Sequence, residues 1–379
     1  MGIVGGFTTV TFPFIATKAG LPVGTTTSIV ALGFLAQGIR IIWAPLADFA
    51  LTLKTWCILG AFGIAGILLL ISLVSLTPFH TALFCVLLFA LNTVGCIQNT
   101  PVPGLLAHNI SDDKKGAAAG FYMAGVMGGT AAGGSLGLWI AQHTGSEALA
   151  CAALALATLL ALSGLFFVEE PKRHLEGMTP GTRFKVLGRD IWHVVKKPAG
   201  LYIVILVMMP IGIGATGNFW PAIAPEWHVS ADLMAFVAGV GTTLATFSGC
   251  LVGGWMADRI NSIKVFLAAS LVLSAIGIAM ALGPRTPSIF AGCTLVYMFA
   301  VGMCNSSYGA MIYRVIGRGA AAFKYTAINS LGNAPTSYMT AFDGYVHDRS
   351  GSAVMLNAEA GICLVLILVF GAIQRRLRI

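Results

Sequence analysis

The sequence predicts an all-α integral membrane protein with twelve transmembrane helices in two six-helix bundles. Hydrophobic residues make up 57% of the 379 residues, charged residues only 9%, and the mean hydropathy is +0.87. A water-soluble fold could not cover so much apolar surface. The apolar residues also gather in runs of roughly 17–25, the length at which a helix crosses a bilayer.

Read from the N-terminus, six apolar runs precede and six follow the only sizeable polar segment. We therefore divide the chain into an N-terminal bundle (1–168), a linker (169–198) and a C-terminal bundle (199–379). The predicted spans are 1–17, 25–47, 55–77, 81–106, 116–142, 147–168, 199–222, 231–257, 263–283, 287–312, 321–346 and 354–373.

Basic residues predict the orientation, because Lys and Arg accumulate in cytoplasmic loops. With the N-terminus inside, the outer loops hold only Lys18, Arg285 and Arg349, and Arg40 lies inside a span, while all the other Lys and Arg residues lie on the inner side. Both termini and the linker are therefore predicted to be cytoplasmic. The net charge of +8 follows from this bias and gives no support to nucleic-acid binding.

The linker is predicted to contain an amphipathic helix on the inner leaflet, with its basic residues near the lipid headgroups. A plain charged linker is the alternative. The apolar positions at roughly helical spacing are Phe184, Leu187, Ile191, Trp192 and Val195.

Two short stretches in opposite halves of the chain repeat one another. Trp43–Asp48 and Gly254–Arg259 each close an apolar run with small residues and an aspartate, and a lysine (Lys54 or Lys264) follows each. A repeat with the same sense in both halves is typical of membrane transporters whose two bundles rock about a central site.

The sequence shows no enzyme chemistry, so we expect no catalytic residue, metal or cofactor. The eight cysteines fall within predicted spans without paired spacing, and the seven histidines are scattered over loops and span ends, which is not a metal-ligand pattern. No Gly-x-x-x-x-Gly-Lys-(Ser/Thr) motif is present, which argues against ATP-driven transport by this chain. A membrane enzyme and a non-transporting sensor are remote alternatives.

The stretch Arg40–Asp48 reads Arg-Ile-Ile-Trp-Ala-Pro-Leu-Ala-Asp, and Gln98, Lys115–Ala117 and Asp343–Tyr345 accompany it. These residues resemble the major facilitator superfamily, in the branch of AmpG-type muropeptide permeases, acetyl-CoA transporters and siderophore-uptake permeases. The resemblance implies a monomeric secondary active transporter of the bacterial cytoplasmic membrane that works by alternating access. It implies proton-coupled uptake of a muropeptide-, siderophore- or acyl-CoA-like solute, and export of drugs or metabolites is the alternative.

The same resemblance assigns roles to the residues of the repeat. Aspartates at the inner ends of spans two and eight contact a facing helix end in this superfamily when the inner gate is closed. Gating is therefore expected of Asp48, Asp258 and the neighbouring Arg259; solvated loop charges are the alternative. Because Met1–Phe7 looks like the middle of a family helix, we expect the first helix to be truncated at its start.

Helices five and eight face one another across the two bundles in this superfamily, and both carry small residues at a spacing of four. Such stripes let two backbones approach and slide, which predicts a seam between the bundles; packing within one bundle is the alternative. The stripes are Gly125, Gly129, Gly133 and Gly137 in span five, and Gly241, Ala245, Gly249 and Gly253 in span eight.

Polar residues inside the spans are the candidate substrate-binding residues, because a polar side chain in lipid needs a protein partner or a ligand. Arg40 would bind an anionic group of the substrate or form a structural ion pair. Pro101 and Pro103 predict a helix break near the site in span four. The candidates are Arg40, Gln98, Asn99, Tyr122, Asn218, Trp220, Asn305, Asn329 and Asn333.

One residue is the candidate for ion coupling. The acids that AmpG-like relatives carry in span four are replaced by Asn99 and Pro103, so coupling is not expected there. Asp343, near the outer end of span eleven, is the candidate, because an isolated carboxylate in lipid can take up a proton. Pairing with Arg349, which would keep Asp343 ionised, is the alternative.

The orientation can be tested with reporter fusions. Fusions at residue 185 and at the C-terminus should both report the cytoplasm, because basic residues dominate the loops on that side. A periplasmic signal from either fusion would contradict the orientation.

Overall fold

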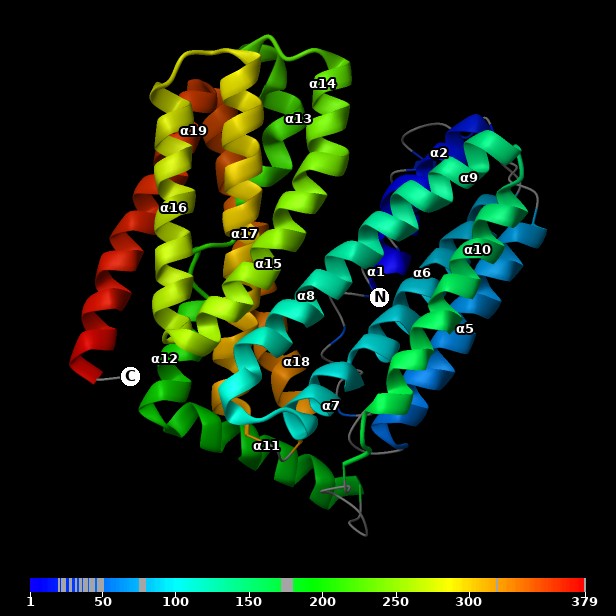
Figure 1. Ribbon diagram of the computed structural model, residues 1–379, viewed down its shortest axis with the longest axis horizontal. Coiled ribbons are helices and arrows are strands. Elements are labelled where there is room, and N and C mark those ends of the chain that lie inside the picture. Colours follow the sequence, from blue (N-terminus) through cyan, green and yellow to red (C-terminus); the bar gives the residue numbers. More distant parts are fainter. Residues whose placement is uncertain are drawn as a thin grey trace. The chain divides into compact units, whose positions relative to one another are not determined.

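The computed structural model describes residues 1–19, 21, 25–26, 29–30, 33, 36, 40, 45, 51–74, 80–171, 180–317 and 320–377. Every regular element among these residues is a helix, and none is a strand (Figure 1). The all-α class predicted from the sequence is confirmed for this part of the chain.

The helices follow the predicted apolar runs. In chain order the elements, with η for 3-10 and π segments, are α1 (Gly2–Gly6), η1 (Phe7–Thr11), α2 (Phe12–Lys18), α5 (Leu53–Leu73), α6 (Thr81–Asn99), α7 (Pro101–Asn109), η3 (Asp112–Lys114), α8 (Lys115–Ala131), η4 (Ala132–Leu136), α9 (Gly137–Thr144), α10 (Glu147–Leu160), η5 (Ala161–Phe167), α11 (Pro180–Lys196), α12 (Pro198–Val207), η6 (Ala215–Phe219), α13 (Trp220–Ile223), η7 (Ala224–Trp227), α14 (Ala231–Phe236), η8 (Val237–Gly241), α15 (Thr242–Arg259), α16 (Ser262–Leu282), α17 (Pro287–Ile316), α18 (Ala321–Leu331) and α19 (Asn333–Leu377). Seven helical stretches in the described ranges are long and apolar enough to cross a membrane, which supports an integral membrane protein. The total of twelve spans stays a prediction.

The chain divides into two compact units. Unit 1 comprises 1–109, 125–191 and 318–327, and unit 2 comprises 110–124, 192–317 and 328–379. Each unit therefore takes one short segment from the opposite half of the sequence.

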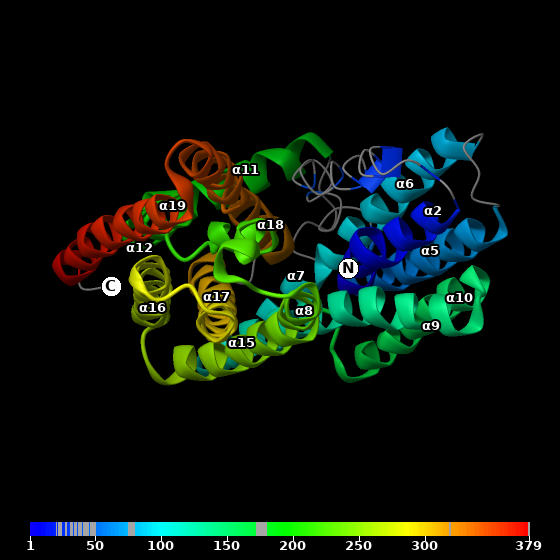
Figure 2. The same cartoon turned by 90° about the horizontal axis from the view of Figure 1, so that it is seen from above.

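Unit 1 is built on α5, α6 and α10, which lie side by side (Figures 1 and 2). The start of α5 is fixed by Thr52, whose hydroxyl accepts the N–H of Thr55. Glu170 of the linker accepts the N–H groups of Leu53 and Lys54 at 2.8 and 2.9 Å. These acceptors satisfy amides that have no partner inside the first helical turn.

The predicted glycine stripes pack largely inside their own units, whereas Gly120 of span five and Gly254 of span eight bring α8 and α15 into backbone contact. In unit 1, Gly129 and Gly133 lie against the backbone of Gly2 and Ile3 in α1. In unit 2, the stripe of α15 lies against α17, and Figure 2 shows these helices beside α16. The sequence predicted close backbone contact, but a stripe does not specify which helix supplies the second backbone.

The predicted break in span four is absent, and the interruption lies in span seven instead. Thr100 keeps helical dihedrals and donates its N–H to Cys96, so α6 and α7 run on as one helical stretch. By contrast, α12 ends at Val207, and Gly212 and Gly214 have φ of 67° and 66°. Glycine reaches this left-handed region without strain, so residues 208–214 can leave the helix.

The linker forms the helix α11, as its pattern predicts. Leu187 is 1% exposed and packs with Ala320, whereas Trp192 is 56% exposed. Part of the apolar stripe therefore packs on the protein, and contact of α11 with the inner leaflet stays a prediction.

The packing of α15 on α17 can be tested with glycine substitutions. Gly253→Ala should lower the midpoint of thermal unfolding in detergent, because its Cβ would lie 2.6 Å from the Cα of Met303 and 2.5 Å from the hydroxyl of Ser306. Overpacking of this kind costs about 1–3 kcal/mol. Gly361→Ala is the matched control, since nothing lies within 4 Å of its Cβ. Equal midpoints for the two variants would contradict the close packing.

Candidate functional site

Two carboxyl groups meet inside unit 2. Asp343 lies on the first half of α19 and is 0% exposed, and Glu359 lies on the second half, beyond the kink at Gly351. The two carboxyls lie close enough to interact, but neither carboxyl oxygen of Asp343 has a hydrogen-bond partner among the described residues. A hydrogen bond between the two groups would require a proton on one of them, because a carboxylate has no donor.

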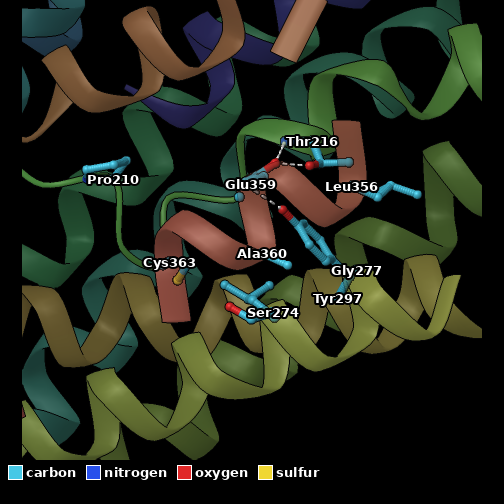
Figure 3. Close-up of a pocket in the computed structure, with 12 residues that line it drawn as sticks. Pro210, Thr216, Ser274, Gly277, Tyr297, Leu356, Glu359, Ala360 and Cys363 are labelled. Carbon is cyan, nitrogen blue, oxygen red and sulfur yellow. Dashed lines mark hydrogen bonds between the residues drawn. The ribbon is translucent and has the colours of Figure 1, made fainter. Parts of the chain in front are cut away.

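Glu359 is held by three donors from two other elements (Figure 3). Its Oε2 accepts the N–H of Thr216 at 3.0 Å and the hydroxyl of Thr216, and its Oε1 accepts the hydroxyl of Tyr297 at 3.3 Å. Thr216 lies in the first turn of η6, directly after the interruption in span seven, where an amide has no helical partner. Glu359 therefore ties the end of the interrupted segment to α17 and α19.

Asp343 has a different environment from its neighbour. No residue in the described ranges hydrogen-bonds to its carboxyl oxygens. Arg349, the alternative partner expected from the sequence, lies over the ring of Tyr345 at 4.3 Å instead. Asp343 is therefore a buried acid without a basic partner among the residues that the structure describes.

A small cavity of ≈ 20 Å³ adjoins Glu359 (Figure 3). Gly212 and Gly214 of the interrupted segment, Ser274 of α16 and the carboxyl-bearing turn of α19 line it. Its volume is sufficient for about one water molecule.

A second, larger cavity of ≈ 130 Å³ also borders the interrupted segment, and Gly212 lines both cavities. Asn305 of α17, Asn329 of α18 and Asn333 of α19 all line it. Three of the candidate substrate-binding residues therefore converge on one cavity, together with Tyr308, which the sequence analysis did not single out.

The other candidates lie elsewhere. Asn218 donates to the hydroxyl of Thr340 at 3.1 Å, and Trp220 is 3% exposed and packs edge-on against Tyr297 at 5.1 Å between ring centroids. Neither residue lines the larger cavity, and a role of either in substrate binding stays a prediction. Gln98 and Asn99 end α6, Tyr122 lies on α8, and Arg40 is partly buried with no hydrogen-bond partner for its Nε among the described residues.

The aspartate of the second repeat binds the N-terminus of a helix. Asp258, at the end of α15, accepts the N–H of Gly116 at 2.5 Å and of Ala117 at 2.7 Å, both in the first turn of α8. Gly120 and Gly254 let the backbones meet, since a Cβ on Gly254 would lie 2.8 Å from the Cα of Gly120. This is the contact that the family resemblance implied for Asp258.

The neighbours of Asp258 behave differently. Arg259 stacks over Trp255 at 4.2 Å and has no part in that contact. Arg314 donates to the carbonyl of Ala257 at 2.7 Å and so supports the last turn of α15. Asp48, the equivalent aspartate of the first repeat, lies outside the described residues.

A helical membrane fold with buried acids, an interrupted span and internal cavities is that of a membrane transport protein. Residues 1–340 match the family model described as Major Facilitator Superfamily, and the chain belongs to that superfamily. Membership supports a secondary transporter of small-molecule solutes rather than an enzyme.

Solved structures agree with this fold. The human organic anion transporter MFSD10 (TETRAN) matches with TM-score 0.68 and 16% identity over 94% of this chain and 88% of its own. The E. coli fucose:proton symporter FucP matches with TM-score 0.70 and 15% identity over 98% of this chain and 97% of its own. A structure of FucP in the outward conformation matches with TM-score 0.67 and 14% identity over 97% of both chains. Such identities show the fold alone, and no curated protein matched the sequence.

Glu359 is the functional residue that sequence reasoning missed. It is an acid inside the predicted span 354–373, and an ionisable residue within a span is by itself a sign of function. That signal was available, but its pairing with Asp343 was not, because the two residues belong to different spans.

The contact between Asp258 and α8 can be tested by hydrogen exchange. Asp258→Asn should raise the exchange rate of the amides at 116–120 roughly 10-fold or more, because charge-assisted hydrogen bonds contribute about 1.5–3 kcal/mol. Asp348→Asn, an exposed acid on α19, is the control and should leave these amides unchanged. Unaltered exchange in Asp258→Asn would show that the carboxylate does not stabilise this helix end.

Proposed function

We propose that this protein is a proton-coupled secondary active transporter that works by alternating access, with Asp343 and Glu359 together carrying the proton. The observation that supports it is the fully buried carboxyl of Asp343 beside the half-buried carboxyl of Glu359, with no basic partner among the described residues. Like charges at such a distance in a low dielectric cannot both be ionised, so the pair holds a proton until its surroundings change.

The hydrogen-bond donors around Glu359 would stabilise its deprotonated state, which follows release of the proton. Thr216 and Tyr297 donate to Glu359, and hydrogen bonds to an ionised carboxylate stabilise it after the proton has left. The pair therefore has a favourable protonated state and a favourable deprotonated state. A carrier must alternate between two such states.

The interrupted segment offers a route from the proton to the solute. Glu359 holds Thr216 at one end of this segment, and Gly212 within the segment lines both cavities. A change in the hold of Glu359 would therefore move backbone that borders the larger cavity. Irregular backbone beside a cavity is a recurring feature of transporter sites.

We further propose that Asp258 and Asp48 are inner-gate residues. Asp258 supports this through its contact with the start of α8, and Asp48 through the sequence repeat alone. Breaking and remaking a helix N-terminal contact costs little, because it exchanges one set of hydrogen bonds for another with water. Arg259 supports the gate only by packing on Trp255.

The nature of the solute rests on the sequence resemblance. The AmpG-type branch favours uptake of a muropeptide-, siderophore- or acyl-CoA-like compound across the bacterial inner membrane by a monomer. Purified protein in proteoliposomes should be screened with anhydro-muropeptides, siderophores, acyl-CoA, simple sugars and drugs, with and without a pH gradient.

The coupling role of the acid pair is tested with the solute that this screen identifies. Asp343→Asn and Glu359→Gln should each lose accumulation driven by a pH gradient, down to the level reached without a gradient, while solute counterflow is retained. Without a titrating pair the protein can still exchange solute but has no proton to move with it.

Asp348→Asn, whose carboxylate is 84% exposed, is the control and should accumulate solute as the unmodified protein does. Full proton-driven accumulation in both pair variants would contradict the proposal. Accumulation driven by a sodium gradient alone would also contradict it.

A further inference from the structure

We infer that the ≈ 130 Å³ cavity in unit 2 is a subsite for an uncharged, hydroxyl- or acetamido-bearing ring of the solute, that is, one saccharide unit. This inference rests on the proposed transport function and names the chemical class of group that the site takes. It is argued from the hydrogen-bonding groups, the charge, the size and the shape of the cavity.

Three side-chain amides at the cavity have no hydrogen-bond partner among the residues that the structure describes. No residue in the described part of the chain hydrogen-bonds to the carboxamides of Asn305, Asn329 and Asn333, which project from three different helices. An amide inside a membrane protein is costly unless it is hydrogen-bonded, so these groups need water or a ligand. Each amide offers two donors and one acceptor, which matches groups that both donate and accept, such as hydroxyls and acetamides.

The cavity carries no charge among its described lining residues. An ionised group placed there would lose its hydration without gaining a counter-charge, at a cost of several kcal/mol. Carboxylate, phosphate and ammonium groups are therefore disfavoured in this subsite. A charged solute could place only its neutral part there.

The cavity is small and has two kinds of wall. Its volume is below the roughly 300–1,000 Å³ typical of a site for a whole drug-sized ligand, so it takes one ring-sized group. The side chains of Val207, Ile211 and Phe266 form the apolar part of the cavity wall, and the three amides form its polar part. A saccharide ring has the same division, with C–H groups on its faces and hydroxyls around its edge.

Gly332, the residue between α18 and α19, belongs to this subsite. The Tyr308 hydroxyl lies directly against Gly332, where any Cβ would collide. Asn329 and Asn333 lie on either side of Gly332. The absence of a side chain at Gly332 therefore leaves room for Tyr308 at the edge of the cavity.

Binding to purified protein tests the inference without any transport step. We would measure the shift in thermal unfolding midpoint with N-acetylglucosamine, and compare glucosamine and glucuronate, which add one positive or one negative charge to a similar ring. N-acetylglucosamine should give a saturable shift, and the two charged sugars should bind at least about 10-fold more weakly, because about 1.4 kcal/mol corresponds to a factor of ten.

Variants then place the binding in this cavity. Asn305→Ala and Asn333→Ala should each weaken N-acetylglucosamine binding by roughly 10-fold, as expected for a lost hydrogen bond that leaves a polar group unpaired. Asn357→Ala is the matched control, since the Asn357 amide bonds the carbonyl of Ala353 outside the cavity. Because Asn333 is exposed to the cavity space, its variant is expected to fold even if Asn305→Ala does not.

The possible results separate this inference from the proposed function. Equal binding of a charged sugar, no binding of N-acetylglucosamine, or unchanged binding in a folded Asn333→Ala would overturn the subsite and leave the acid pair untouched. If Asp343→Asn loses proton coupling but binds the sugar as before, the result supports the coupling role of the acid pair and leaves the subsite in place.

Discussion

The hydrogen bonds from Thr216 to Glu359 are the interaction on which the functional half of this molecule depends. In lipid, a backbone amide that leaves a helix must find another acceptor, because no water is available to replace it. Residues 208–214 leave the helix, and the amide of Thr216, just beyond them, donates to the carboxylate of Glu359. Without that acceptor, an amide near the interruption would lose its partner.

This constraint explains why acids, interruption and cavities occur together. Gly212 and Gly214 supply backbone freedom, Glu359 and Tyr297 supply the polar anchors, and both cavities border the interrupted segment at Gly212. A buried acid is expensive by itself, so its presence indicates use. In the proposed mechanism, Asp343 and Glu359 together form the site that binds and releases a proton.

At the C-terminal end of α15, a carboxylate again satisfies backbone amides that have no partner within their own helix. Asp258 satisfies two amides at the start of α8, and glycines at the crossing allow the two backbones to touch. A carboxylate is favoured there because the N-terminus of a helix carries partial positive charge. Contacts of this kind are strong enough to hold a helix end and weak enough to exchange with water.

Sequence alone determined the helical class, the positions of most apolar helices and the close approach of glycine-bearing helices. It also identified Asn305, Asn329, Asn333 and Asp343 as candidate polar residues inside the spans. These follow from composition and period, which depend only on neighbours along the chain. The tertiary structure decided which helices the glycines touch, where the chain is interrupted, and that Asp343 meets Glu359 rather than Arg349. The physical reason is that these are contacts between separate helices, and an apolar span has the same pattern whichever neighbour it packs against.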